Sequence, residues 1–207
     1  MLLLVTGGTG AGKSAYARLL AESLGREAIG FTCPAWPLLD ASQGAGAGAD
    51  ADAKASSDTQ DADAFADAKH APGRRGFAWT QLPADGACAQ TLTRVNLDSN
   101  PYRAERRALV LDSLSGWLRH RVLEVRPGEV DKGGAAAEAG KLLGALLAFE
   151  GVVIVVTEEA AAGLASDPRE RAYIKLLAES NRRLAAASHT IYRLSFGIAE
   201  AIRGERI

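Results

Sequence analysis

The feature that most constrains the fold of this chain is a glycine-rich segment that directly follows an apolar run near the N-terminus. The run is Leu2 to Thr6, and the segment is Gly7-Gly8-Thr9-Gly10-Ala11-Gly12-Lys13-Ser14. Its spacing matches Gly-x-x-x-x-Gly-Lys-Ser/Thr, the phosphate-binding loop called the P-loop, which lies between a strand and a helix. A glycine-rich turn with an incidental lysine is the alternative interpretation. The flanking patterns, apolar before the loop and helical after it, favour the P-loop.

Each part of this loop has a chemical reason to bind phosphate. Glycines allow successive backbone N–H groups to turn toward phosphate oxygens, and the N-terminus of the following helix adds partial positive charge. We expect Lys13 to reach the β- and γ-phosphates and the Ser14 hydroxyl to ligate Mg²⁺. The sequence therefore predicts that the whole segment binds ATP or GTP, through Gly7, Gly8, Thr9, Gly10, Ala11, Gly12, Lys13 and Ser14.

Short apolar runs alternate with longer helical patterns along most of the chain. This order is typical of an α/β fold in which a mostly parallel central sheet is flanked by helices. Together with the loop, it predicts a P-loop NTPase-like architecture. The expected strands are Leu2–Thr6, Ala28–Cys33, Phe77–Leu82, Ala108–Leu114, Gly151–Thr157 and Thr190–Ser195, and the expected helices are Ser14–Leu24, Ala135–Phe149 and Glu170–Ala187.

The length of 207 residues suits a single domain, 1–207, with one interruption. Residues 41–66 consist mostly of Ala, Gly, Asp and Ser, and the first large apolar residue among them is Phe65. Such a composition buries too little surface to offset the entropy of ordering, so we expect a flexible insertion there. Its aspartates do not follow the order of an EF-hand, which disfavours a calcium site.

The charge balance gives no reason to expect a polyanionic partner. The chain has 24 Lys and Arg against 25 Asp and Glu, for a formal net charge of −1. Nucleic-acid and membrane-surface binding usually require a basic surface, and no apolar run approaches the roughly 20 residues that span a bilayer. We therefore expect a cytoplasmic protein with small-molecule partners, bound neither to nucleic acid nor to a membrane.

A second acidic group is expected near the P-loop to hold the magnesium ion. The apolar stretch Leu109-Val110-Leu111 ends in Asp112. Carboxyl ends of parallel strands meet at the ligand-binding edge of a sheet, so Asp112 is our candidate for this metal-binding carboxylate. The alternative is that Asp112 only caps the helix that follows.

Three further groups are candidates on weaker grounds. His70 lies in the segment His70-Ala71-Pro72-Gly73-Arg74-Arg75, where two guanidinium groups suit phosphate binding. A histidine there can act as a nucleophile on phosphorus, or it can be an ordinary surface residue in a basic turn. Glu158 and Glu159 follow an apolar strand, where they either contact a ligand or begin a helix.

Several segments, in order along the chain, resemble the adenosylcobinamide kinase / adenosylcobinamide-phosphate guanylyltransferases of cobalamin biosynthesis. Thr6-Gly7-Gly8 through Lys13-Ser14 is similar to the family's opening, and Leu111-Asp112-Ser113-Leu114 with Trp117 is similar to its L-D-C-L-T-x-W segment. His70-x-x-Gly73-Arg74 with Trp79 and Thr80 resembles its H-x-x-G-R-P-x-x-W-x-T stretch. The remaining similar segments are Val155 to Gly163, against V-S-N-E-V-G-x-G, and Asn181 to Ala187 with Gly197-Ile198.

The resemblance implies a bifunctional transferase. Its first step is nucleotide-dependent phosphorylation of the adenosylcobinamide hydroxyl, and its second is transfer of GMP from GTP through a guanylylated histidine, giving adenosyl-GDP-cobinamide. His70 is then the nucleophile, with Lys13 and Asp112 as the other catalytic residues. Arg74, Arg75 and Glu159 join the P-loop as nucleotide-binding residues, Mg²⁺ is the cofactor, and a homo-oligomer, a trimer in the family, is expected with active sites between subunits.

The chain also departs from the family pattern. Glu158 stands where the family carries Asn, Ala161 replaces its first glycine, and Arg75 replaces the proline after Gly-Arg. Two other functions therefore stay open. One is a P-loop small-molecule kinase without guanylyltransferase activity, and the other is a nucleotide-binding regulatory protein without catalysis.

Overall fold

The computed structural model describes residues 1–33, 76–98, 107–124, 134–159 and 167–205. The expected insertion at 41–66 lies outside these ranges, and so do His70, Arg74 and Arg75. Within the ranges, the strands are β1 (Leu2–Gly7), β2 (Glu27–Thr32), β3 (Ala78–Pro83), β4 (Arg107–Asp112), β5 (Val152–Val156), β6 (Thr190–Ser195) and β7 (Ile198–Arg203). The helices are α1 (Lys13–Leu24), α3 (Cys88–Leu97), α5 (Leu114–Glu124), α6 (Gly134–Leu147) and α7 (Pro168–Ala187).

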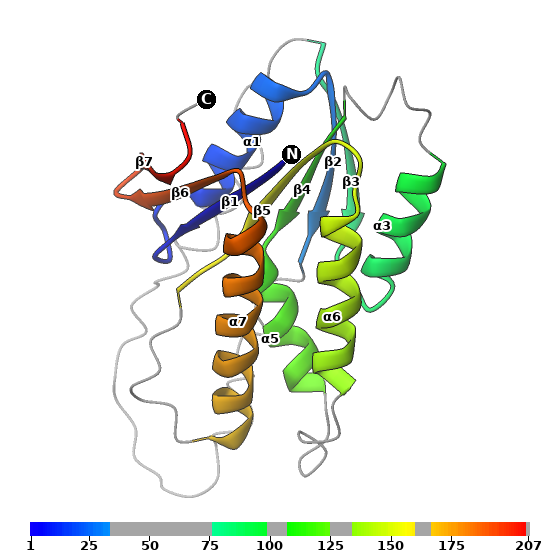
Figure 1. Cartoon of the computed structure of the whole chain (residues 1–207), viewed down its shortest axis with the longest axis vertical. Helices are drawn as coiled ribbons and strands as arrows, with labels where there is room; N and C mark the ends of the chain where they lie inside the picture. The colour runs from blue at the N-terminus through cyan, green and yellow to red at the C-terminus, as the bar shows by residue number, and fades with distance from the viewer. Residues whose placement is uncertain (34–75, 99–106, 125–133, 160–166, 206–207) are drawn as a thin grey trace, which may run out of the picture.

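The strands form one sheet in the order β3-β2-β4-β5-β1-β6-β7 (Figure 1). Every neighbouring pair is parallel except the last, in which β7 returns antiparallel to β6. Parallel pairing places the carboxyl ends of β1, β4 and β5 at the same edge of the sheet. The predicted α/β fold with a mostly parallel sheet is confirmed.

Helices cover the two faces of the sheet unequally. Helix α1 packs on one face, where Ala17, Leu20 and Ala21 join the strand residues Leu3, Val5, Val110, Ile154 and Tyr192 in one apolar cluster. Helices α3, α5, α6 and α7 cover the other face, where their apolar side chains meet alternate residues of the same strands, such as Leu4, Leu111 and Val155. Because both faces are covered, the central strands are apolar on both sides.

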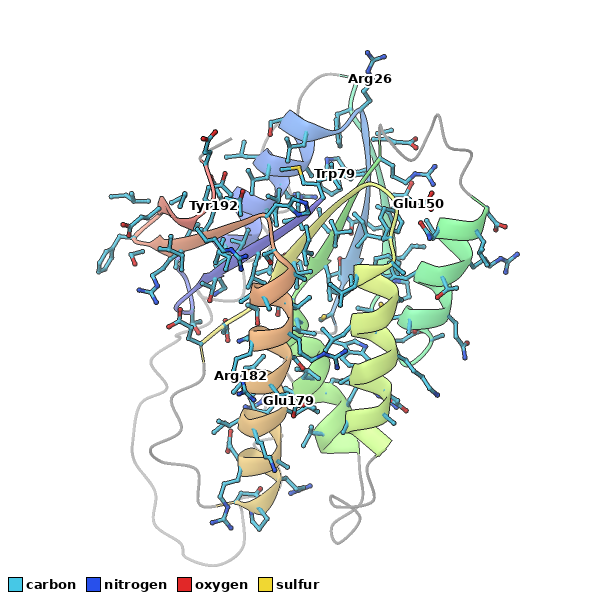
Figure 2. The ribbon with its side chains drawn as sticks, in the orientation of Figure 1. Arg26, Trp79, Glu150, Glu179, Arg182 and Tyr192 are labelled. Atoms are coloured by element: carbon cyan, nitrogen blue, oxygen red, sulfur yellow. The ribbon has the colours of Figure 1, made fainter. Side chains whose placement is uncertain are left out.

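Side chains drawn on the ribbon show this arrangement (Figure 2). Trp79 of β3 and Tyr192 of β6 lie on the α1 side of the sheet, and the Tyr192 ring packs edge-on against Tyr16 of α1, with 5.2 Å between ring centroids. Glu179 and Arg182 project from α7 into solvent. The outer surface of α7 is therefore polar, whereas Leu177 and Leu184 of the same helix are buried.

Local sequence explains where the last long helix begins. Asp167 has extended backbone angles and its carboxylate accepts a hydrogen bond from the Arg169 backbone N–H at 2.8 Å, while Pro168 occupies the first helical turn. Both are helix-start features, because a capping carboxylate satisfies a free N–H and proline needs no donor there.

The sequence-based boundaries were wrong at one strand and incomplete elsewhere. The strand expected over Ala108–Leu114 ends at Asp112, and Leu114 instead begins α5 as a buried core residue. Apolarity alone does not distinguish a strand end from a buried helix start. Helix α3 and the edge strand β7 were not anticipated, and α5 was considered only as the helix that would follow Asp112.

Candidate functional site: a P-loop at the carboxyl edge of the sheet

The glycine-rich loop lies between β1 and α1, at the carboxyl edge of the sheet. Gly7, Gly10 and Gly12 have φ angles of 150°, 73° and 87°, which side-chain-bearing residues rarely adopt. At Gly7 space is also lacking, because an added Cβ would lie 2.4 Å from the Leu194 carbonyl oxygen. The glycines are thus needed both for the turn and for close contact with β6.

The loop is further fixed to the turn between β6 and β7. The Gly197 N–H donates to the Ala11 carbonyl oxygen at 3.2 Å, and the Ala11 N–H donates to the Gly8 carbonyl oxygen at 3.2 Å. The first backbone N–H groups of α1 follow directly after this turn. Since the first N–H groups of a helix have no partner within the helix, this end of α1 suits an anionic ligand.

Lys13 is buried and folds back over its own loop. Its ammonium group donates to the carbonyl oxygens of Gly7 and Gly8, at 3.1 and 2.7 Å, and to Glu158 Oε1 at 3.1 Å. Glu158 lies just beyond the end of β5, the strand between β1 and β4. The lysine is therefore held at the point where the loop and the neighbouring strand end meet.

Ser14 and Asp112 face one another across the same edge. The Ser14 hydroxyl donates to Asp112 Oδ1 at 3.1 Å, which joins the start of α1 to the end of β4. Burial raises the pKa of Asp112 above its ordinary value; the Ser14 hydrogen bond and the charges of Lys13 and Arg18 oppose the shift, and Glu158 adds to it. A carboxylate that burial destabilises is stabilised by a nearby cation.

The donor set fits a magnesium ion. A serine hydroxyl and a carboxylate are oxygen ligands, and Mg²⁺ commonly binds one or two such groups while keeping several waters. Within the described ranges, no cluster of three or more His, Cys, Asp or Glu side chains is suited to hold a metal. The Ser14 hydroxyl and the Asp112 carboxylate are the groups of the candidate site whose chemistry suits such an ion.

The two glutamates after β5 have different surroundings. Glu158 pairs with Lys13, whereas Glu159 is exposed and pairs with Arg193 of β6 at 3.1 Å. The structure thus brings together Lys13, Ser14, Asp112 and Glu158, and it places Glu159 on Arg193 beside them. The contact between Glu158 and Lys13 was not anticipated, although the position of Glu158 after an apolar strand marked it as a candidate.

Asn181 fixes the backbone next to Glu158. Its amide group donates to the Glu158 carbonyl oxygen at 2.9 Å, and its side-chain oxygen accepts from the Thr157 hydroxyl at 2.8 Å. Thr157 is itself tied to β1, because its N–H donates to the Val5 carbonyl oxygen at 2.9 Å. These contacts connect α7 to the strand ends at the site.

Cys33 lies near the site but is not suited to nucleophilic chemistry. Its Sγ donates to the Ser113 carbonyl oxygen at 2.7 Å, and burial raises the pKa of the thiol to about 12. Because the thiolate is the reactive form, the raised pKa disfavours reaction of this thiol at neutral pH. Three expected site residues lie outside the described residues: the phosphate ligands Arg74 and Arg75 and the nucleophile His70.

None of the helices in the described ranges has the length and apolar character needed to cross a membrane.

Comparison with known proteins gives one family match. A family model described as cobinamide kinase / cobinamide phosphate guanyltransferase matches residues 53–202, which is more than half of the chain. The match includes His70, Asp112 and Glu158, and it begins after the P-loop, so the loop and the family match are separate observations. No curated protein matches the chain.

Two of the solved structures with a related shape are ATPases of low sequence identity. One is described as a prototypical ATPase from the type III secretion system of pathogenic bacteria, with 12% identity and a TM-score of 0.48 over 97% of this chain and 56% of that chain. Another is described as an ATPase domain, with 12% identity and a TM-score of 0.44 over 94% of this chain and 69% of that chain. The present chain thus spans little more than half the length of the first of them.

Proposed function

The chain belongs to the cobinamide kinase / cobinamide phosphate guanyltransferase family, and from that premise we propose that it carries out both reactions of the family name. In the first, a nucleoside triphosphate bound at the P-loop phosphorylates the hydroxyl group of a cobinamide. In the second, the GMP moiety of GTP is transferred to the cobinamide phosphate. The observation that carries the proposal is the convergence of Lys13, Ser14 and Asp112 at one edge of the sheet in a chain of this family.

Each of these residues has a part in phosphoryl transfer. The loop N–H groups and Lys13 hold the phosphates and neutralise the charge that develops on the transferred group. Ser14 and Asp112 would hold Mg²⁺, which, when bound, neutralises phosphate charge and orients the β- and γ-phosphates. The acceptor oxygen forms its bond to the γ-phosphorus as the bond from that phosphorus to the nucleoside diphosphate breaks, so positioning the two reactants is the main task of the protein.

For the second reaction we propose His70 as the nucleophile. A neutral imidazole nitrogen attacks the α-phosphorus of GTP, pyrophosphate leaves, and the histidine carries GMP until the cobinamide phosphate displaces it. Arg74 and Arg75 support this role by sequence, since nearby positive charge favours the neutral imidazole and opposes the negative charge on phosphorus. Covalent catalysis divides one difficult displacement into two easier ones.

The test uses the purified chain with Mg²⁺ and GTP labelled at the α-phosphorus, followed by denaturation. We expect a protein-bound label that acid removes and base does not, as for a phosphorus–nitrogen bond to histidine. The label should be absent in His70→Ala and present in the matched control His120→Ala, which removes a histidine from α5.

The other outcomes identify the alternatives. Phosphorylation of cobinamide by the wild-type chain without any adduct would indicate a kinase alone and would overturn the role of His70. Nucleotide binding without turnover of cobinamide would indicate a regulatory protein and would overturn the proposed enzyme function as a whole.

A further inference from the structure

The Lys13 ammonium group has all three of its hydrogen-bond donors occupied. Its acceptors are the Gly7 and Gly8 carbonyl oxygens and the Glu158 carboxylate. An ammonium group has three N–H donors and no more. A phosphate oxygen can therefore bind Lys13 only by displacing one of these acceptors.

Glu158 is the acceptor that can leave. The Gly7 and Gly8 oxygens belong to the loop backbone, which is fixed by contacts with β6 and Gly197. The Glu158 contact is made by a side chain that is 28% exposed, whereas the side chain of Lys13 is 8% exposed. Since carboxylate and phosphate oxygens are both anionic acceptors, one can replace the other on the lysine.

The backbone of Glu158 is held by contacts that do not involve its side chain. The Asn181 amide holds the Glu158 carbonyl oxygen, and Asn181 is held in turn by Thr157. The carboxylate therefore remains close to the phosphate site after it releases Lys13. There it opposes the negative charge of the bound nucleotide, whereas the asparagine that the family resemblance places at this position has no charge.

We propose that Glu158 is a positioning residue that holds Lys13 when no nucleotide is bound and competes with nucleotide phosphates for it. Entry of the nucleotide exchanges a carboxylate for phosphate on the lysine, and return of the carboxylate favours release of the nucleoside diphosphate. The inference rests on the proposed function only in requiring that the P-loop binds nucleotide.

The experiment measures the dissociation constants of the imido analogues of ATP and GTP, with Mg²⁺, by titration calorimetry. We expect Glu158→Gln and Glu158→Asn to bind the preferred analogue about two- to fivefold more tightly than the wild type, the change that corresponds to one partly exposed ion pair. In a Lys13→Ala background, Glu158→Gln should tighten binding less than it does in the wild type, because only the charge repulsion is relieved and there is no lysine left to compete for.

The matched control is Glu27→Gln, which removes the carboxylate that pairs with Arg107 at the opposite end of the parallel strands. It should leave the dissociation constant unchanged. A purely structural role of Glu158 would weaken binding when the residue is replaced, so the direction of the change separates the two roles.

Unchanged or weaker binding in Glu158→Gln, or equal tightening in the Lys13→Ala background, would overturn the inference. A wild-type chain that binds an analogue and fails to phosphorylate cobinamide would count against the proposed function alone. The calorimetric comparison does not depend on turnover, so the two failures are distinguishable.

Discussion

At the scale of single residues, environment separates two carboxylates of the site. Asp112 is bound by the Ser14 hydroxyl and burial raises its pKa, whereas Glu158 forms an ion pair with Lys13. A buried carboxylate with a raised pKa favours a cation beside it. The environment of Asp112 therefore suits binding of a metal ion. The environment of Glu158 suits competition with phosphate for Lys13.

Replacing Asp112 by Asn is expected to separate stability from activity. Burial raises the pKa of Asp112 in the folded protein above its ordinary value of 3.8. At pH values above this folded-state pKa, the ionised carboxylate therefore lowers the stability of the protein when no Mg²⁺ is bound. This loss of stability disappears below about pH 3.8. Asp112→Asn should therefore be more stable than the wild type to urea at pH 7 without Mg²⁺. Its turnover of cobinamide should fall by about 10²-fold or more, because the cation loses a ligand.

The matched measurement is urea unfolding of both proteins at pH 7 and at pH 4. The advantage of Asp112→Asn should shrink as the pH falls, since the wild-type carboxyl group becomes neutral as well. A variant that is less stable at pH 7, or one that keeps normal turnover, contradicts the account of this carboxylate.

The two cysteines give a second prediction at this scale. Burial raises the pKa of Cys33 and of Cys88 to about 12. At pH 8 the folded chain should react with iodoacetamide at least about 10²-fold more slowly than the chain in urea, because almost no thiolate is present. The rate should rise as the pH is raised toward 12, and equal rates in the two conditions would show that the thiols are not buried in this way.

At the scale of elements, the geometry of the P-loop depends on contact between the β1–α1 loop and β6. Gly7 provides that contact, since it has no side chain to collide with the Leu194 carbonyl oxygen. Gly8, by contrast, has nothing within 4 Å of an added Cβ. The two neighbouring glycines thus serve different purposes.

Gly7→Ala should destabilise the fold by about 1–3 kcal/mol or more, from backbone strain and the collision together. Gly8→Ala is the matched control and should change the free energy of unfolding by less than about 0.5 kcal/mol. Urea unfolding followed by circular dichroism measures both. Equal stability of the two variants would mean that the loop is not held against β6 as described.

The elements that the sequence predicted are those with strong patterns. The continuous apolar runs of β1, β4 and β5 identified the centre of the sheet. Together with the P-loop spacing, they led to Lys13, Ser14 and Asp112 as candidates, which the structure places at one edge of that sheet. Strand β7 was missed because its larger residues Ile198 and Ile202 are exposed while Ala199 and Ala201 are partly buried, which reverses the usual pattern. The Lys13–Glu158 pair could not be predicted, since it joins residues that only the strand order brings together.

At the scale of the whole molecule, two separate observations meet in one chain. The family match covers residues 53–202, and the P-loop lies before it. The sheet order joins the two parts, because β1, which carries the loop, lies between β5 and β6 of the matched region. The candidate phosphate site therefore contains residues of both parts.

The expected homo-oligomer with shared active sites gives a prediction at this scale. If the GTP that His70 attacks is bound at the P-loop, Lys13→Ala and His70→Ala should each be inactive alone in forming the labelled adduct. Co-expressed together, they should recover part of the activity if the loop of one subunit serves the histidine of another. No recovery in mixed oligomers would place both groups in the same subunit, and a monomer in sedimentation experiments would exclude a shared site.

The most direct test of the central claim, that the P-loop site transfers phosphate to a cobinamide, uses ATP or GTP labelled at the γ-phosphorus. The wild-type chain should move the label to cobinamide in the presence of Mg²⁺, and Lys13→Ala should lose this activity by about 10²-fold or more. Label transfer that survives in Lys13→Ala, or its absence in a wild-type chain that binds the nucleotide, would contradict the account.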